Sequence, residues 1–330
     1  MTVTVERTTP ASRAGAVVGV LVIAALLALP WTSDAGVMRV IVEFIAMLVL
    51  AQMWNLLAGY AGLVSIGQQA YVGLGGYALM VLADDVGVNP FLAVPLAGVA
   101  GVGFALPTAA LVFRFRGGYF AVGTWAVAEV YRLLIANTGA LGRGTGRTLK
   151  AVFPLARETR ELATYGLAVA LGVAAIAAIY VYLRSRLGLG LMAVRDSEPA
   201  SQSLGVDVFR TKLAVYLVAA FGTGTTGALL YLNLLRISPD AAFSINWTAY
   251  TIFIVVIGGL GTLEGPIVGT LVFFLLRELL ADYGSWYMIL LGTLAVVAMM
   301  RYPQGLWGLV AERWDLRFFP VQRRVRADRP

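Results

Sequence analysis

The sequence has no cysteine and no histidine, and only 13% of its 330 residues are charged. Without these two residue types the chain cannot form disulfides, thiolate nucleophiles, imidazole bases or the usual zinc and haem sites. It also has no Gly-x-x-x-x-Gly-Lys-Ser/Thr segment, so it is not itself a P-loop ATPase. Its 18 carboxylates show no recognisable catalytic or metal-binding spacing. We therefore expect no enzyme, and no cofactor or metal held by this chain.

Apolar residues are abundant instead. They make up 59% of the chain, and the mean hydropathy is +0.81, whereas an average soluble domain is about a quarter charged. Too little polar surface remains to cover a water-soluble globule, so lipid must be part of the solvent. The net charge of +7 is explained better by basic residues that flank membrane spans and contact anionic headgroups than by nucleic-acid binding.

The apolar stretches predict an all-α integral membrane protein of roughly ten transmembrane helices, since one span needs about 20 residues. The first stretch, Ala14–Trp31, lacks a good signal-peptide cleavage site and is followed at once by further spans, so we expect it to be retained. The other spans are expected at 37–58, 60–83, 91–113, 118–137, 163–183, 211–235, 247–263, 265–281 and 284–300. The short ones near 247–281 could instead be re-entrant, or broken around the Gly-rich stretch Gly258–Gly265.

The distribution of basic residues predicts the orientation. With ten spans and a cytoplasmic N-terminus, 16 Lys and Arg residues fall inside and 7 outside, which favours both termini in the cytoplasm. The loop 138–162 carries five basic residues and argues against this orientation. We divide the chain into a cytoplasmic tail (1–13), a transmembrane domain (14–310) that includes a cytoplasmic loop (184–210), and a basic cytoplasmic tail (311–330).

Two short segments share a pattern. Gly62–Ile66 and Gly259–Leu263 both read Gly-Leu-x-Ser/Thr-aliphatic, which is compatible with a 5+5 inverted repeat of the kind found in many transporters. A match of this length also arises by chance in a Gly-rich membrane protein.

The stretch Asn55–Tyr77 combines many small residues with the polar side chains Ser65, Gln68 and Gln69, which would be costly facing lipid. It could be a broken segment that lines a path, or a close helix crossing whose amides bond between helices. Six charges lie in or near spans and are functional candidates by default, namely Glu43, Glu129, Arg132, Glu264, Arg277 and Glu278. Glu43, the deepest, could line a path or form a hydrogen-bonded helix contact, and Glu129 with Arg132 could be a buried pair or a snorkelling end.

The longest polar stretch between confident spans runs from Arg184 to Lys212. It can form one short amphipathic helix before Pro199 and another up to Gly205. Such an element would suit docking to a soluble partner, although an ordinary solvated loop has the same composition.

Five motifs, in order over about residues 40–310, resemble the LivM-type permease subunit of branched-chain amino acid ABC importers. They are Asn55–Tyr77, Gly117–Ala121, Gly190–Gly205, Ile257–Pro266 and Arg301–Leu306. The resemblance implies the ABC importer permease fold in a bacterial plasma membrane. It also implies three kinds of partner besides lipid: a second homologous permease, two ABC ATPase subunits that bind the ATP, and an extracytoplasmic solute-binding protein.

On this resemblance we assign two groups of site residues. The translocation path is expected to include Glu43, Ser65, Gln68, Gln69 and Tyr71, and coupling to the ATPase is expected to involve Arg195, Asp196, Glu198, Ala200 and Gly205. A path for a branched aliphatic side chain needs smooth Gly, Ala and Val walls, which this chain can provide, and nothing covalent is expected to happen to the solute.

The sequence departs from the family pattern in three places, of which the first bears on the coupling residues and the other two leave the solute open. Pro199-Ala200-Ser201 occupies the positions where ABC importers carry Glu-Ala-Ala. Gln68-Gln69 stands where many family members have residue pairs of the Gly-His or His-Ala type. The stretch Gly142–Arg147 stands where the family usually has an acidic Gly-rich stretch. The same machinery could carry urea, short amides or another amino acid. A carrier that works alone on an ion or proton gradient is the alternative from another class.

Overall fold

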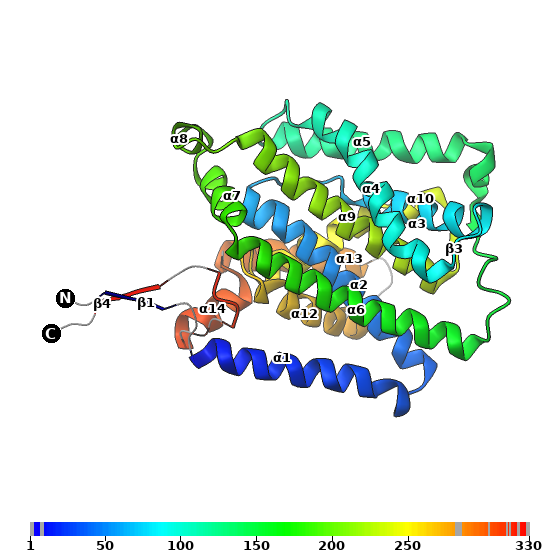
Figure 1. The fold of residues 1–330 in the computed structure, drawn as a ribbon, viewed down its shortest axis with the longest axis horizontal. Helices are drawn as coiled ribbons and strands as arrows, with labels where there is room; N and C mark the ends of the chain where they lie inside the picture. The colour runs from blue at the N-terminus through cyan, green and yellow to red at the C-terminus, as the bar shows by residue number, and fades with distance from the viewer. Residues whose placement is uncertain are drawn as a thin grey trace.

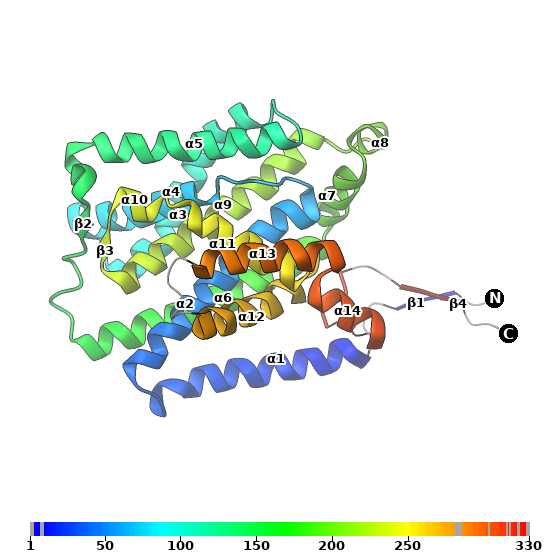
Figure 2. The same cartoon turned by 180° about the vertical axis from the view of Figure 1, so that it is seen from behind.

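The computed structural model describes residues 3–6, 10–280, 286–302, 304–314, 316, 318–321 and 324–327. Over these residues the chain is a bundle of long helices that lie side by side along one axis (Figures 1 and 2). The prediction of an all-α protein is confirmed.

The helices alternate in direction through the bundle. In chain order they are α1 (Pro10–Ala28), α2 (Ala35–Asn55), α3 (Gln68–Met80), α4 (Pro90–Val112), α5 (Gly118–Asn137), α6 (Arg157–Arg184), α7 (Arg186–Asp196), α8 (Glu198–Ser203), α9 (Val208–Leu234), α10 (Pro239–Ala242), α11 (Ile245–Gly258), α12 (Glu264–Leu280), α13 (Trp286–Arg301) and α14 (Gly305–Trp314). Short 3-10 turns, Leu29–Trp31, Gly139–Leu141 and Arg143–Thr145, and two π-helical turns, Leu56–Tyr60 and Val81–Asp85, extend or link them.

Four short strands form two antiparallel pairs. β1 (Val3–Glu6) pairs with β4 (Arg324–Ala327), and β2 (Arg147–Thr148) pairs with β3 (Arg236–Ile237). The first pair brings the two ends of the chain together beside α14, and the second joins two loops at the opposite end of the bundle (Figure 2).

Within the described residues, eight helical segments are long and apolar enough to cross a bilayer. Each of the ten predicted stretches contains a helix, but α3 and α12 have only 13 and 17 residues. The multi-pass architecture is confirmed, while the count of ten and the inverted repeat stay predictions.

The core of the bundle lies where α9 packs along α3 and α4, with α2 against them (Figure 1). Glycines permit this close packing, because a Cβ on Gly75 of α3 would lie 1.9 Å from the carbonyl oxygen of Gly224 on α9. One on Gly227 would lie 2.2 Å from the carbonyl oxygen of Val72. Small residues at contacts are how helices associate in lipid, where apolarity alone gives no preference for protein over solvent.

Two of the expected spans are interrupted. The span expected at 60–83 becomes regular α-helix only at Gln68, because 62–67 are non-helical, and the break expected around Gly258–Gly265 is confirmed at 259–263. Gly62, Gly259 and Gly261 have φ of +70°, +134° and +77°. A right-handed helix cannot contain these angles, and glycine adopts them without steric cost.

The segments predicted to be cytoplasmic gather at one end of the bundle. α7 and α8 of the loop 184–210 lie there with α14 and both chain ends, whereas β2, β3 and α10 lie at the other end (Figures 1 and 2). The two helices predicted around Pro199 are present, and Ser197 caps α8 by accepting from the backbone N–H of Ala200. In the two predicted tails, 1–2, 7–9, 315, 317, 322–323 and 328–330 lie outside the described residues.

Candidate functional site

The two helix breaks meet inside the bundle. We call residues 59–67 and 259–263 together the break junction. The two segments approach so closely that a Cβ on Gly59 would lie 2.6 Å from the backbone nitrogen of Gly261. A larger residue than glycine at position 59 would therefore push the two breaks apart.

Side-chain amides of α2 hold the second break in place. Asn55 donates from Nδ2 to the carbonyl oxygen of Thr262 (2.8 Å) and accepts at Oδ1 from the backbone N–H of Gly261 (2.8 Å). One turn earlier, Gln52 donates from Nε2 to the carbonyl oxygen of Leu263 (2.7 Å). Backbone groups released by a break in a membrane helix must find such partners, because lipid offers none.

The first break is held in the same way. The indole N–H of Trp54 donates to the carbonyl oxygen of Ser65 (2.8 Å), and the backbone N–H of Ile66 donates to the hydroxyl of Thr124 on α5 (3.1 Å). The hydroxyl of Ser65 accepts from the backbone N–H of Gly67 (3.1 Å), which turns the chain into α3. Ser65 is buried, so its role in this structure is to shape the turn.

Buried polar contacts continue from the first break along α3. We call the residues that make these contacts the polar lane; they are Gln68, Gln69, Tyr71, Tyr216, Thr223 and Thr248. Gln68 Oε1 accepts from the hydroxyl of Thr223 on α9 (2.9 Å). Gln69 Oε1 accepts from the hydroxyl of Thr248 on α11. The hydroxyl of Tyr71 donates to the hydroxyl of Tyr216 on α9 (2.9 Å). Every member is at most 4% exposed.

The structure contains elements of both interpretations left open for Asn55–Tyr77, while its place along a translocation path stays a prediction. The segment is broken, and its amides bond between helices. The structure brings together Ser65, Gln68, Gln69 and Tyr71 of the predicted path. Sequence reasoning missed Thr223, Thr248 and Tyr216, although the alternation of glycine and threonine over 222–227 is a signal for close packing with hydroxyls.

Two hydroxyls near the lane lack partners. Those of Tyr77 on α3 and Tyr231 on α9 are buried and make no hydrogen bond within the described part of the chain. A buried unsatisfied hydroxyl costs about 1–3 kcal/mol, so the packing of α3 against α9 is least favourable at these two tyrosines.

Glu43 stands apart from the other predicted path residues. Its carboxylate accepts from both terminal nitrogens of Arg277 on α12 (2.5 and 3.2 Å), and about a third of each side chain is exposed (35% and 31%). The guanidinium also lies 4.4 Å from the centre of the Phe274 ring. This geometry favours the hydrogen-bonded helix contact over a place in the path.

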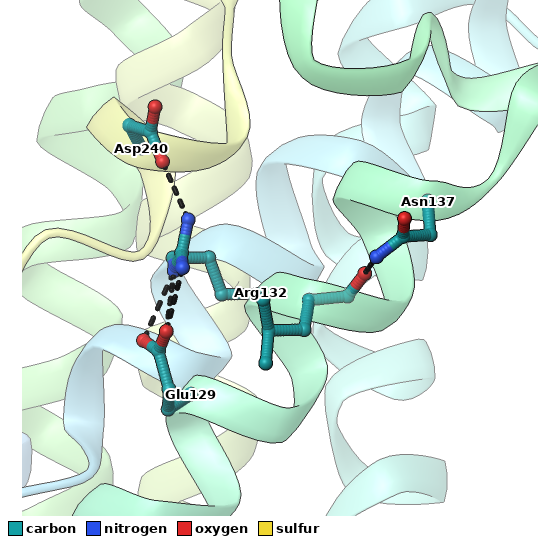
Figure 3. A network of polar contacts seen from close by, with 5 residues as sticks. Glu129, Arg132, Asn137 and Asp240 are labelled. Atoms are coloured by element: carbon teal, nitrogen blue, oxygen red, sulfur yellow. Dashed lines mark hydrogen bonds and ion pairs between the residues drawn. The ribbon is translucent and has the colours of Figure 1, made fainter.

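Three of the other charges in or near spans, Glu129, Arg132 and Glu264, also have partners. Figure 3 shows Arg132 between Glu129, one turn back on α5, and Asp240 of α10, with contacts of 2.6 Å to each. Glu264 is buried at the start of α12, where Oε1 accepts from the backbone N–H groups of Phe318 and Phe319 (both 2.9 Å). Within the described ranges no group of three carboxylates is placed to hold a metal ion.

The predicted coupling loop reaches the break junction through one side chain. Arg195, near the end of α7, donates from Nη1 to the carbonyl oxygen of Gly59 (2.8 Å), and its other nitrogens donate to Asp196 Oδ1 (3.1 and 3.0 Å). A Cβ on Gly62 would lie 3.3 Å from Arg195 Cγ, and one on Gly261 would lie 3.8 Å from its Nη1. Arg195 is therefore hydrogen-bonded to the turn before the first break and lies close to Gly62 and Gly261, one in each break.

The remaining coupling residues shape the end of the loop. Glu198 pairs with Lys212 of α9, and the backbone N–H of Ala200 donates to the Ser197 hydroxyl (3.4 Å). Gly205 has a φ of +84° and reverses the chain toward α9. At this turn Leu204 is 82% exposed, which leaves an apolar side chain at the tip of the loop.

Comparisons with known proteins agree with this architecture. A family model described as branched-chain amino acid transport system / permease component matches residues 36–299. The high-affinity branched-chain amino acid transport system permease proteins LivM of Escherichia coli and Salmonella typhimurium are 28% and 27% identical, over 91% and 88% of this chain and 76% and 74% of theirs. A probable LivM of Methanocaldococcus jannaschii is 24% identical over 64% of this chain and 66% of its own. No solved structure matches.

Proposed function

Because the chain belongs to the branched-chain amino acid transport permease family, we propose that it is the permease subunit of an ATP-driven importer of leucine, isoleucine and valine. The observation that carries this proposal is the family match over 36–299, which includes the break junction, the polar lane and the loop 184–210. The names of the LivM relatives support the solute class.

The polar lane is the proposed translocation path in a closed state. Its amide oxygens and hydroxyls bond to one another, and glycines bring α3 and α9 into backbone contact, so no solute passes in this arrangement. When the helices separate, Gln68, Gln69 and Tyr71 would offer hydrogen bonds to the amino and carboxylate groups of an amino acid. The surrounding Gly, Ala and Val surface would accept the aliphatic side chain.

Arg195 is the proposed link between the loop and the path. Movement of α7 and α8 on an ATPase would pull on the carbonyl of Gly59 and so on both helix breaks. Hydrogen bonds to a charged group are worth about 1.5–3 kcal/mol, which is enough to bias two arrangements of a packed junction about tenfold or more. Leu204 at the tip of the loop is the proposed apolar anchor for that partner.

The proposed assembly has four further subunits of three kinds. They are a second homologous permease, two ABC ATPases that hold the ATP, and an extracytoplasmic solute-binding protein. The end that carries α7, α8 and both chain ends then faces the cytoplasm of a bacterial cell. The predominance of basic residues in the segments gathered at this end supports that orientation.

A solute panel tests the proposal. The operon that encodes this chain is expressed in a strain lacking its own branched-chain uptake, and entry of radiolabelled leucine, urea, acetamide and glutamate is compared. We expect leucine uptake that unlabelled isoleucine and valine suppress. Uptake of urea or acetamide without leucine would assign the chain to another solute of the same machinery.

A further inference from the structure

A cavity opens at the end of the bundle opposite α7 and α8, where the starts of α2 and α6 meet the end of α9. It encloses about 430 Å³, within the range of about 300–1,000 Å³ typical of small-molecule sites. It is separate from the polar lane and from the coupling loop, since none of their residues lines it.

The mouth of this cavity is strongly basic. Three arginines, Arg39, Arg157 and Arg160, line it with a single carboxylate, that of Glu161. Glu161 already accepts from Arg39 (2.6 Å) and Arg157 (3.0 Å). The guanidinium of Arg160 makes no ion pair or side-chain hydrogen bond within the described ranges, so the lining carries an excess of two positive charges with donors to spare.

The most buried part of the lining is largely apolar. Val42 and Leu232 are each 1% exposed and lie beside buried Thr164, whereas Leu234 is 56% exposed and belongs to the rim. The chain turns sharply here, because Leu235 has a φ of +63°, which is rare for a residue with a side chain. This residue is the C-cap of α9, and its backbone N–H donates to the carbonyl oxygen of Tyr231.

We infer that this cavity binds an oxyanion, a carboxylate or phosphate, that carries an apolar chain. Arg160 and Arg157 would hold the charged group, since the guanidinium fork matches the geometry of both anions, and the Val42–Leu232 wall would hold the chain. Two sources supply this chemistry, namely the amino acid on its way into the bundle and an anionic phospholipid beside it. Binding of an apolar oxyanion is inferred from the cavity, and only the amino acid as its source rests on the proposed function.

The test is binding to the purified full chain, without its partners. In one arm, native mass spectrometry counts lipids retained from nanodiscs of phosphatidylglycerol or of phosphatidylcholine. In the other arm, calorimetry compares L-leucine with L-leucinamide, which lacks the carboxylate. We expect binding in at least one arm, preferring the ligand with the anion, and a loss of about tenfold or more in Arg160→Gln, as for a charged hydrogen bond.

Matched variants keep the result decisive. Arg143→Gln makes the same charge change in an exposed loop at the same end and should bind like wild type. If Arg160→Gln fails to fold, Arg157→Gln replaces a side chain that is 69% exposed, retains the Arg39–Glu161 pair, and should show the same loss. Binding in the lipid arm alone identifies a phospholipid headgroup as the bound anion. Binding in the leucine arm alone identifies the amino acid as the ligand. Equal behaviour of wild type and both cavity variants in both arms would overturn the inference.

Discussion

Helices α1 and α3 have similar apolar, glycine-containing sequences, yet they occupy opposite environments. No residue in the apolar window of α1 is buried, and a Cβ on its Gly19 would meet nothing within 4 Å. Nearly all of α3 is buried, and a Cβ on its Gly75 would collide with the backbone of Gly224 on α9. In lipid, therefore, hydropathy selects the spans, but the spacing of small and polar residues selects which spans form the interior.

The largest effect is expected from a single methyl group in α3. Gly75→Ala places a Cβ 1.9 Å from the carbonyl oxygen of Gly224, so α3 and α9 must separate, and overpacking of this kind costs about 1–3 kcal/mol or more. We expect loss of most folded protein, measured by fluorescence-detected size exclusion and thermal stability in detergent. The same change at Gly19 is the control and should be silent, and a folded Gly75→Ala with wild-type stability would contradict the packing account.

A second prediction separates the coupling link from the rest of α7. Arg195→Gln removes the charged hydrogen bond to the carbonyl of Gly59, and leucine uptake by the assembled importer should fall about tenfold or more. ATP hydrolysis should continue without matching transport. Arg186→Gln, in the same helix but exposed, should transport normally. Equal uptake by the two variants would make the loop a simple connector.

A third prediction concerns the polar lane. Thr248→Val removes the hydroxyl that donates to Gln69 and leaves a buried amide unsatisfied, at a cost of about 1–3 kcal/mol. Thr226→Val is matched to it, because Thr226 is equally buried but bonds only to the carbonyl of Gly222 in its own helix. Thermal unfolding should show a clear loss for the first variant and little for the second. Similar losses of thermal stability for both variants would show that hydrogen bonds of the polar lane contribute no more than a hydroxyl bonded within its own helix.

The smallest effect is expected at the opposite end. Arg147 donates to both carboxylate oxygens of Asp85 (2.8 and 2.6 Å) and holds the pKa of Asp85 below its ordinary value of 3.8. The pair therefore contributes its full stability above that pH and loses it as the pH falls through the lowered pKa. Asp85→Asn should slightly speed amide hydrogen exchange in 138–156 at neutral pH. The corresponding loss in the free energy of local opening should be no more than about 1 kcal/mol, as for an exposed ion pair. A difference that persists unchanged at pH 2 would point to another cause.

The sequence predicted the spans well because each needs a long apolar run, and every predicted run contains a helix. It also located the break at Gly258–Gly265, because clustered glycines permit left-handed backbone angles. It could not show that this break meets the one at 62–67, or that Arg195 joins them. These contacts connect residues 136 to 207 positions apart, and only the packing of the bundle brings them together.

Individual charges were the hardest to place. Glu43 has the position of a path residue in its apolar stretch, but its partner Arg277 lies 234 residues away and holds it at a partly exposed contact between α2 and α12. Periodicity within one helix does not reveal which neighbour supplies a counter-charge. For Gln68 and Gln69 the contact between helices was one of two alternatives, because an uncharged amide is costly facing lipid, and their place in the translocation path stays a prediction.

The account depends most on the division of labour between this chain and separate motor proteins, and uptake into vesicles tests it directly. Lipid vesicles holding the purified chain alone, or the complete importer with its binding protein and internal ATP, are given radiolabelled leucine. Leucine should accumulate only with the complete importer and only while ATP is hydrolysed. Accumulation by the chain alone under a proton or sodium gradient would contradict the account.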